Sequence, residues 1–191
     1  MVRKKGKLFI ISAPSGSGKT TLCERLIKRI PNIVRSISLT TRPPRKGEKD
    51  SKDYLFVTKE EFKKEMINKR LLEWAINFGY YYGTPKDKVL GLLARGTDVI
   101  LAIDVKGAMK IKRLYPKEVF IFILPPSMSE LKDRLKKRKT DDHLGVSKRI
   151  KVAKRELSYL SKYTYSIVND NLKKATDKLE AIVIAERCKV Q

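Results

Sequence analysis

The chain has 191 residues, enough for one core domain with insertions but too few for two independent domains of ordinary size. Its formal net charge is +23 at pH 7, and 41% of its residues are apolar, so a real core can form and global disorder is excluded. The basic residues are spread along the whole chain and interleaved with Asp and Glu. This pattern indicates a solvated surface and no specific nucleic-acid-binding tract.

No apolar run is long enough to cross a bilayer, and the charged N-terminus lacks the long apolar region of a signal peptide. Cys23 and Cys188 are the only cysteines and lie far apart, so they form neither a metal-binding motif nor a disulfide framework. We therefore expect a cytoplasmic protein with no membrane partner.

The first elements in chain order are a strand and a helix joined by a Gly-rich turn. The apolar run 8–12 predicts a buried parallel strand, and the amphipathic pattern 20–30, which ends before Pro31, predicts a helix. The polar segment 36–53 predicts a short strand followed by an exposed loop. A capping-box pattern then predicts a helix over 58–68.

The middle of the chain alternates between short strands and helices. Segments 71–78 and 80–83 resemble short strands, and 85–94 is a helix candidate. The run 98–104 predicts a second buried strand that ends in a carboxylate, and 107–115 predicts another helix.

The last third continues the same alternation. The run 119–124 predicts a third buried strand, and a charged helical region at 129–162 is interrupted near 140–145. A short strand at 165–168 and a helix at 176–189 complete the chain. Buried strands that alternate with helices predict an α/β fold, with a parallel sheet core flanked by helices.

Two polar, arginine-bearing stretches, 38–86 and 129–157, break this rhythm. In an α/β fold, ligands lie at the carboxyl ends of the strands, where such insertions can serve as a substrate platform and a lid. The core is then expected to consist of 1–37, 87–128 and 158–191.

The turn after the first strand fits the phosphate-loop pattern, with Ala in place of the first Gly. It consists of Ala13, Pro14, Ser15, Gly16, Ser17, Gly18, Lys19 and Thr20, and is followed by Thr21. The two glycines let successive N–H groups point at phosphate oxygens, and the following helix adds the positive end of its dipole. The lysine can neutralise the β- and γ-phosphates, and the Thr20 hydroxyl can ligate Mg²⁺. The loop predicts binding of a nucleoside triphosphate and leaves the phosphoryl acceptor open.

Further motifs follow in register along nearly the whole chain. They are Ser36–Glu48, Asp53-Tyr54 with Phe56, Leu72–Ala75, Tyr81–Thr84, Ile103-Asp104, Phe122–Ser127 and Ile167–Asp170. Together with the phosphate loop, they resemble the guanylate kinases. The resemblance implies a P-loop nucleoside monophosphate kinase fold with an inserted GMP-binding domain and a helical lid. It also implies Mg²⁺-dependent transfer of the ATP γ-phosphoryl group to GMP or dGMP, giving ADP and GDP or dGDP.

The resemblance assigns the acceptor site to named residues. Guanine presents two adjacent donors, N1–H and N2–H₂, and the Glu73 carboxylate would accept from both, whereas adenine would leave it unpaired. Ser38 and Thr84 would bind O6 or N7, and Asp104 would act near the acceptor nucleotide or the hydration shell of Mg²⁺. Arg42 and Arg45 would bind the GMP phosphate, beside the hydroxyls of Tyr54 and Tyr82 and next to Gly83.

The resemblance also assigns lid and adenine contacts. Arg134, Arg138 and Arg149 resemble the lid arginines that stabilise charge on the transferring group, and Asn169 resembles the residue near the adenine ring. The chain departs from the family pattern at Ala102, where many members carry an additional Asp, and at Lys106, Lys137, Lys139 and Asn171. The change at Ala102 puts a metal-related role at that position in doubt.

Three other interpretations stay open at this point. A non-catalytic guanylate-kinase-like module that binds protein partners would share the fold. A kinase for another nucleotide would share the phosphate loop, and the net charge alone would give weak, salt-sensitive binding of nucleic acid. Glu73 could instead form a surface pair with Arg70. Monomer and dimer are equally compatible with the sequence.

Overall fold

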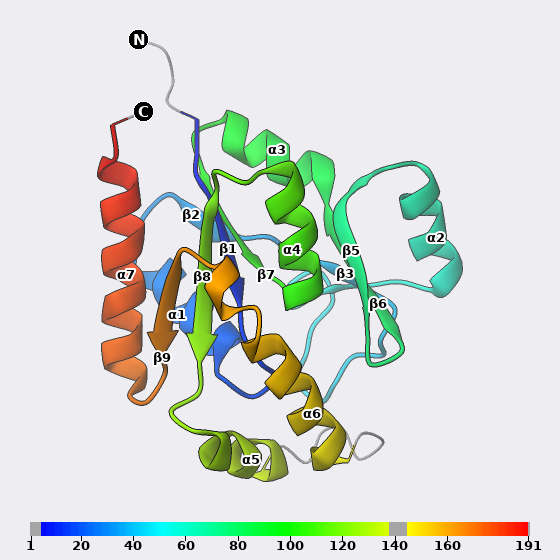
Figure 1. Cartoon of the computed structure of the whole chain (residues 1–191). Helices are drawn as coiled ribbons and strands as arrows, with labels where there is room; N and C mark the ends of the chain where they lie inside the picture. The colour runs from blue at the N-terminus through cyan, green and yellow to red at the C-terminus, as the bar shows by residue number, and fades with distance from the viewer. Residues whose placement is uncertain (1–4, 138–144, 191) are drawn as a thin grey trace.

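The computed structural model of the chain describes residues 5–137 and 145–190. Within them, five parallel strands form a central sheet in the order β2-β7-β1-β8-β9 (Figure 1). The strands are β1 (Leu8–Ser12), β2 (Ile33–Arg35), β7 (Asp98–Ala102), β8 (Val119–Leu124) and β9 (Tyr165–Val168). The predicted α/β fold with a parallel sheet is confirmed, although β2 was not predicted.

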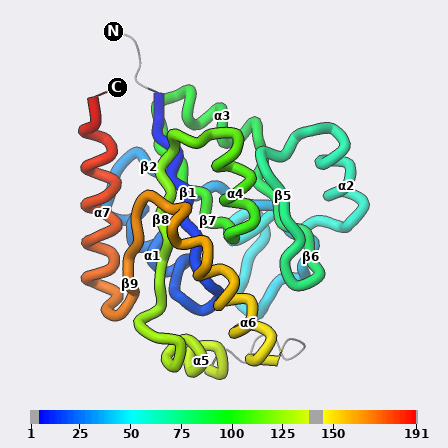
Figure 2. Tube along the Cα trace, in the orientation of Figure 1, coloured from blue at the N-terminus to red at the C-terminus, as the bar shows by residue number. Residues whose placement is uncertain are grey.

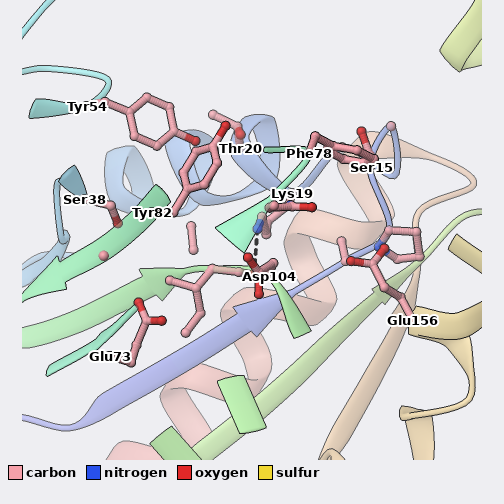
Figure 3. Close-up of a pocket in the computed structure, with 18 of the residues that line it drawn as sticks. Ser15, Lys19, Thr20, Ser38, Tyr54, Glu73, Phe78, Tyr82, Asp104 and Glu156 are labelled. Carbon is pink, nitrogen blue, oxygen red and sulfur yellow. Dashed lines mark hydrogen bonds between the residues drawn. The ribbon is translucent and has the colours of Figure 1, made fainter. Parts of the chain in front are cut away.

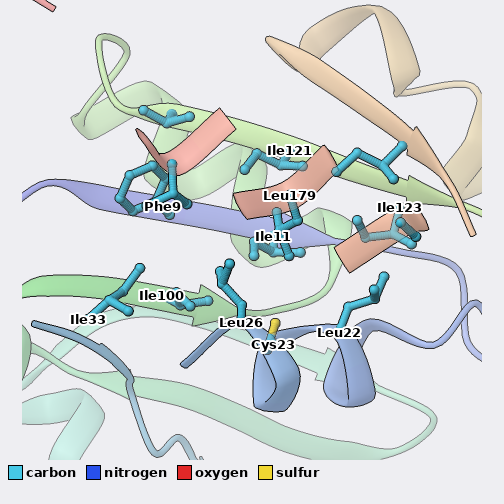
Figure 4. Packing of buried hydrophobic residues seen from close by; sticks show 14 of the residues in the cluster. Phe9, Ile11, Leu22, Cys23, Leu26, Ile33, Ile100, Ile121, Ile123 and Leu179 are labelled. Atoms are coloured by element: carbon cyan, nitrogen blue, oxygen red, sulfur yellow. The ribbon is translucent and has the colours of Figure 1, made fainter. Parts of the chain in front are cut away.

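Helices cover both faces of this sheet because the strands are apolar on both faces. Alternate residues of β1 enter different clusters: Phe9 and Ile11 face α1 (Lys19–Arg29) and α7 (Leu172–Cys188). Leu8 and Ile10 instead face α3 (Lys86–Ala94) and α4 (Val105–Leu114). Figure 4 shows the first cluster, in which Leu22 and Leu26 of α1 lie opposite the sheet. The core therefore holds the end of β1 and the start of α1 in a fixed relation.

A second sheet lies to one side of the core and is built from residues 39–85 (Figures 1 and 2). Its order is β4-β3-β6-β5, with strands β3 (Leu39–Thr40), β4 (Leu55–Phe56), β5 (Leu71–Asn77) and β6 (Tyr80–Pro85). The helix α2 (Lys59–Ile67) packs beside it. The predicted capping box is confirmed, because the Thr58 side chain accepts from Glu61 N and the Glu61 side chain accepts from Thr58 N.

The predicted helical region near the end of the chain forms α5 (Met128–Lys137) and α6 (Val146–Leu157), followed by a short 3₁₀ turn at Leu160–Lys162. The two helices pack through a small apolar cluster of Leu131, Leu135 and Ala153. Arg138 and Lys139, which lie between them, fall outside the described residues. The division of the chain into core, GMP-binding domain and lid stays a prediction.

Several element boundaries differ from those expected. The helix α7 begins at residue 172, because the Asn171 side chain accepts from the backbone N–H groups of Lys173 and Lys174. The strand β7 ends at Ala102, so Asp104 is not a strand residue; it caps α4, where its side chain accepts from Gly107 N at 2.9 Å. Throughout the described part of the chain, no helix is long and apolar enough to span a membrane.

Candidate active site

The turn between β1 and α1 has the backbone geometry that phosphate binding requires. Gly16 and Gly18 have positive φ values of 92° and 88°, which side-chain-bearing residues rarely adopt. A Cβ atom at Gly18 would also collide with the side-chain nitrogen of Asn169. The helix α1 starts directly at Lys19, so the positive end of its dipole faces the loop. No acidic residue in its first turn offsets this positive charge.

Asn169 holds the phosphate loop from behind. Its side-chain amide donates to the Ser17 carbonyl at 2.8 Å, and its backbone N–H donates to Leu124 O at 2.8 Å. Arg134 donates to the Asn169 carbonyl at 3.1 Å. Asn169 is only 5% exposed, and its observed contact is the one that supports the phosphate loop. Its role near the adenine ring stays a prediction.

Lys19 points across the end of the sheet towards Asp104 (Figure 3). Its Nζ donates to the Ile103 carbonyl at 2.7 Å. Burial lowers the pKa of Lys19, and the nearby Asp104 carboxylate opposes this shift. The ammonium group is thus held beside the phosphate loop, and an anionic partner there would stabilise its charged form.

One cavity joins the phosphate loop to the second sheet. Figure 3 shows Ser38, Tyr54, Tyr82 and Glu73 on one side of Lys19, with Ser15 on the other. The expected site residues that line this cavity are Ala13, Pro14, Ser15, Gly16, Gly18, Lys19, Thr20, Ser38, Arg45, Tyr54, Glu73, Tyr82, Gly83 and Asp104. The expected residues Ser17, Thr21, Arg42, Thr84, Arg134, Arg149 and Asn169 do not line it.

Glu73 lies inside the protein, where its side chain is 6% exposed. Its Oε1 accepts from the Thr84 hydroxyl at 2.7 Å. A Cβ atom at position 107 would lie 2.5 Å from Oε2, so only glycine lets α4 approach this carboxylate. Burial raises the pKa of Glu73 to about 7, although the bond from Thr84 opposes the shift. The alternative surface pair is wrong, because Arg70 contacts Glu65 at 3.4 Å instead.

Arg42 is held by a residue to which the sequence gave no role. Both carboxylate oxygens of Glu48 accept from Arg42 Nη2 at 2.9 Å, and Glu48 Oε2 also accepts from Arg45 N at 2.7 Å. The Arg42 guanidinium lies 5.5 Å from the centre of the Tyr54 ring. Glu48 belongs to the Ser36–Glu48 motif, but only the folded loop shows that it holds the Arg42 guanidinium and the backbone of Arg45.

The lid candidates lie further from the cavity. Arg134 donates to Glu130 at 3.1 Å through Nε, and Arg149 is 6% exposed on α6.

Three cavity residues were missed by the sequence analysis: Asn77, Phe78 and Glu156. The strand-turn-strand pattern places the first two at a hairpin tip, whereas nothing in the charged stretch around Glu156 distinguishes it from its neighbours. Burial raises the pKa of Glu156 to about 7, against the effect of Lys19.

The departures from the family pattern have local roles. Ala102 lines the cavity without supplying a carboxylate. Lys106 donates to Ile76 O at 3.2 Å and so connects α4 to β5. Lys137 ends α5, and Asn171 caps α7.

The residues present fit a Mg²⁺ ion that is held mainly by substrate. The described residues contain no group of three or more His, Cys, Asp or Glu side chains that could hold a metal ion by themselves. Thr20 is exposed in the cavity, where its hydroxyl is available, and Asp104 lines the same space. A few oxygen donors combined with substrate phosphates and water suit Mg²⁺.

A phosphate loop that shares one cavity with a second, arginine-bearing segment defines a P-loop kinase with a small acceptor. A family model described as guanylate kinase matches residues 5–186. The chain belongs to the guanylate kinase family. Its activity is therefore the phosphorylation of GMP by ATP, with Mg²⁺ as cofactor.

The relatives cover nearly the whole chain. It is 50% identical over 189 residues to a guanylate kinase of Caldanaerobacter subterraneus subsp. tengcongensis, covering 99% of this chain and 92% of that protein. It is 49% identical over 185 residues to one of Carboxydothermus hydrogenoformans, covering 97% and 91%.

Solved structures agree with this assignment. The crystal structure of guanylate kinase from Anaplasma phagocytophilum matches with a TM-score of 0.84 and 37% identity, covering 100% of this chain and 90% of that one. A shikimate kinase from Bacteroides thetaiotaomicron matches with a TM-score of 0.51 at 12% identity, covering 93% and 98%; this is a likeness of fold alone.

Proposed function

We propose that the Glu73 carboxylate selects guanine in the transfer of the ATP γ-phosphoryl group to GMP or dGMP. The buried carboxylate at the acceptor end of the cavity is the observation that carries this proposal. An ionised carboxylate can accept from N1–H and N2–H₂ of guanine together, whereas adenine would leave it unpaired and buried. Ser38 supplies a hydroxyl donor for O6 or N7; Thr84 here donates its single proton to Glu73, so it orients Glu73 and would have to turn its hydroxyl to serve O6 or N7.

The donor half of the site is proposed to act by positioning and charge. The backbone N–H groups of Ala13 to Thr20 bind the triphosphate, and Lys19 leaves the Ile103 carbonyl to bind its β- and γ-phosphates. Mg²⁺, when bound by Thr20 and the substrate phosphates, supplies neutralisation of the developing charge. Because the attacking GMP phosphate is already anionic, alignment of the two substrates removes the need for a strong general base.

The arginines are proposed to act on the phosphates from two sides. Arg42 and Arg45 bind the GMP phosphate, with Tyr54 and Tyr82 beside it and Gly83 allowing close approach; Asp104 lies between the two substrates. Arg134, Arg138 and Arg149 stabilise the transferring group when the lid closes. Because Arg134 and Arg149 do not line the cavity, this role requires that α5 and α6 move relative to the core.

The base preference is tested by measuring ADP formation from ATP and Mg²⁺ with GMP, dGMP, AMP, CMP and UMP as acceptors. GMP and dGMP are expected to give rates well above those of the other three. If GMP gives no more ADP than AMP does, the proposed acceptor is wrong. A non-catalytic protein-binding module would give no nucleotide-dependent ADP formation at all.

The role of Glu73 is tested by Glu73→Gln, because glutamine keeps the shape of the side chain but replaces one acceptor oxygen by an NH₂ donor. One of the two guanine donors then faces another donor and loses its acceptor. The variant should lose about 100-fold or more in kcat/KM for GMP, while the Kd for ATP changes little. Glu65→Gln on the exposed α2 is the matched control and should behave as the wild type. An equal loss in both substrates would contradict the role of Glu73.

We also propose that the protein acts in the cytoplasm and has no specific nucleic-acid partner. The supporting observation is the dispersed distribution of its 44 Lys and Arg residues along the chain. Binding of unrelated DNA oligonucleotides should be weak, equal among sequences, and lost with added salt. A strong preference for one sequence at 0.15 M salt would refute this.

A further inference from the structure

A second cavity adjoins the nucleotide cavity on its far side from the phosphate loop. It has a volume of about 510 Å³ and lies between α4, α6, the 3₁₀ turn and the tip of the β5–β6 hairpin. This volume is in the range typical of small-molecule sites. The two cavities share Asn77, Phe78, Asp104 and Glu156, which form the wall between them. No residue of the phosphate loop lines the second cavity, and neither do the proposed guanine contacts Ser38, Glu73 and Thr84.

The floor of the second cavity is apolar and partly aromatic. Val105 is 3% exposed, and Met109 and Val152 are half-buried on α4 and α6. Phe78 and Tyr159 contribute rings from the hairpin tip and from the end of the α6 segment. A flat apolar or aromatic group would bury well against these side chains.

The rim of the same cavity is cationic. It carries Lys106, Lys112, Arg113, Arg155 and Lys162. Lys106 and Lys112 are held in place, because they donate to the carbonyls of Ile76 and Lys162, respectively. Within the described residues, the side chains of Arg113 on α4 and Arg155 on α6 form neither an ion pair nor a hydrogen bond; Arg155 accepts from Ser158 only through its backbone carbonyl. Two guanidinium groups on the rim, one from each helix, suit a phosphate or another multivalent anion.

The acidic residues at the cavity do not cancel this charge. Asp104 is used in capping α4, where it accepts from Gly107 N. Glu156 lines both cavities, so five cationic side chains of the second cavity face two acidic ones. The rim therefore offers an excess of positive charge to a ligand.

The backbone at Phe78 is an independent sign of a ligand site. Phe78 and Gly79 form the two-residue turn between β5 and β6, with φ values of 51° and 82°. Such turns favour Asn-Gly, and a bulky residue with positive φ is a conformational outlier. Outliers of this kind cluster at ligand clamps, and this one places a ring in the wall shared by both cavities.

We propose that this second cavity binds a small phosphorylated aromatic compound, with its ring against Phe78 and Met109 and its phosphate between Arg113 and Arg155. Such a ligand would connect α4 of the core to α6 and so restrain the position of α6. The site stands on its own contacts and does not depend on the proposed role of Glu73. Its binding is therefore measurable even if the acceptor of the kinase reaction were misassigned.

The test uses 1-naphthyl phosphate as the probe, titrated by calorimetry into the protein saturated with GMP, so that the acceptor site is filled. One molecule should bind per chain. Arg113→Gln and Arg155→Gln should each weaken the Kd about tenfold, because each removes a charge-assisted contact to the phosphate. Arg25→Gln, at an exposed position of α1, changes the net charge equally and should leave the Kd unchanged.

Two further probes separate the halves of the proposed ligand. Both 1-naphthol, which lacks the anion, and inorganic phosphate, which lacks the ring, should bind at least tenfold more weakly than 1-naphthyl phosphate. Phe78→Asn should weaken the aromatic probe without unfolding the hairpin, because asparagine accepts positive φ. Equal binding of either fragment, an equal effect of Arg25→Gln, or no saturable binding beside GMP would each overturn the proposal.

Amide hydrogen exchange shows where on the chain the probe binds. The probe should slow amide exchange in α6 and in the hairpin tip of the wild type and leave α2 unchanged, and at the same probe concentration it should slow α6 less in Arg155→Gln. Slowing spread evenly over the chain, or confined to the phosphate loop, would place the probe elsewhere and contradict the site.

Discussion

At the scale of single residues, the position of Glu73 depends on two neighbours in space. Thr84 supplies one hydrogen bond, and Gly107 leaves room for the other carboxylate oxygen. These contacts hold the side chain in a fixed orientation but do not compensate for the loss of water, so burial raises its pKa to about 7. The guanine donors would supply the missing partners, and Glu73 is therefore a group whose ionised form is stabilised by substrate.

This shift predicts how stability depends on pH. The folded-state pKa of Glu73 lies above its unfolded value of 4.5, so the native state binds the proton more tightly. Its contribution to stability is fully present below pH 4.5 and is lost as the pH rises through about 7. Without ligands, Glu73→Gln should therefore match the wild type near pH 4 and exceed it by roughly 1–3 kcal/mol at pH 8, measured by urea unfolding.

The same experiment carries its own control. Glu65→Gln alters a half-buried surface carboxylate that pairs with Arg70, and this variant should gain no stability over the wild type between pH 4 and pH 8. Saturating GMP should remove the advantage of Glu73→Gln, since only the wild type gains the guanine contacts. A Glu73→Gln variant that is less stable than the wild type at pH 8 would show that the carboxylate is not penalised by burial.

At the scale of elements, local signals were sufficient for the strand–loop–helix unit that begins at β1 and for the capping box of α2. Both depend on residues that are close in sequence, such as the pair Thr58 and Glu61. The contacts that position the site were not predictable in this way. Asn169 contacts Ser17 across 152 positions of sequence, and Glu156 is an ordinary charged helix residue until α6 packs beside Lys19.

The start of α7 is a further case of an element fixed by one side chain. The Asn171 side chain accepts from two backbone N–H groups at 3.0 and 3.1 Å, and Leu179 and Val183 of the helix enter the core. Asn171→Ala should lower the free energy of unfolding by about 1 kcal/mol, because both N–H groups lose their acceptor. Asn171→Asp keeps the acceptor and adds a favourable charge at the helix start, so it should be at least as stable as the wild type.

Urea unfolding of the two variants measures this difference. A parallel loss in Asn171→Asp would indicate that the amide group itself, rather than capping, is required at this position.

At the scale of the whole molecule, the dominant feature is a net charge of +23 on 191 residues. Among the ion pairs of the described residues, solvent-exposed ones such as Arg70–Glu65 at 3.4 Å contribute little to stability. Self-repulsion therefore lowers the stability of the compact state more than surface pairing raises it. Both cavities gain from the same charge, because it attracts anionic ligands over distances of about 10 Å at 0.1 M salt.

Screening should therefore stabilise the protein. Raising NaCl from 0.02 M to 0.5 M is expected to raise the Tm by roughly 2–6 °C, because screening weakens the repulsion. A variant with glutamine at Lys63, Lys132 and Lys151, which are exposed on α2, α5 and α6, has a net charge lower by three. It should start from a higher Tm at 0.02 M NaCl and gain less from added salt. A Tm that falls with NaCl in both proteins would mean that ion pairs, not repulsion, dominate the electrostatics of this surface.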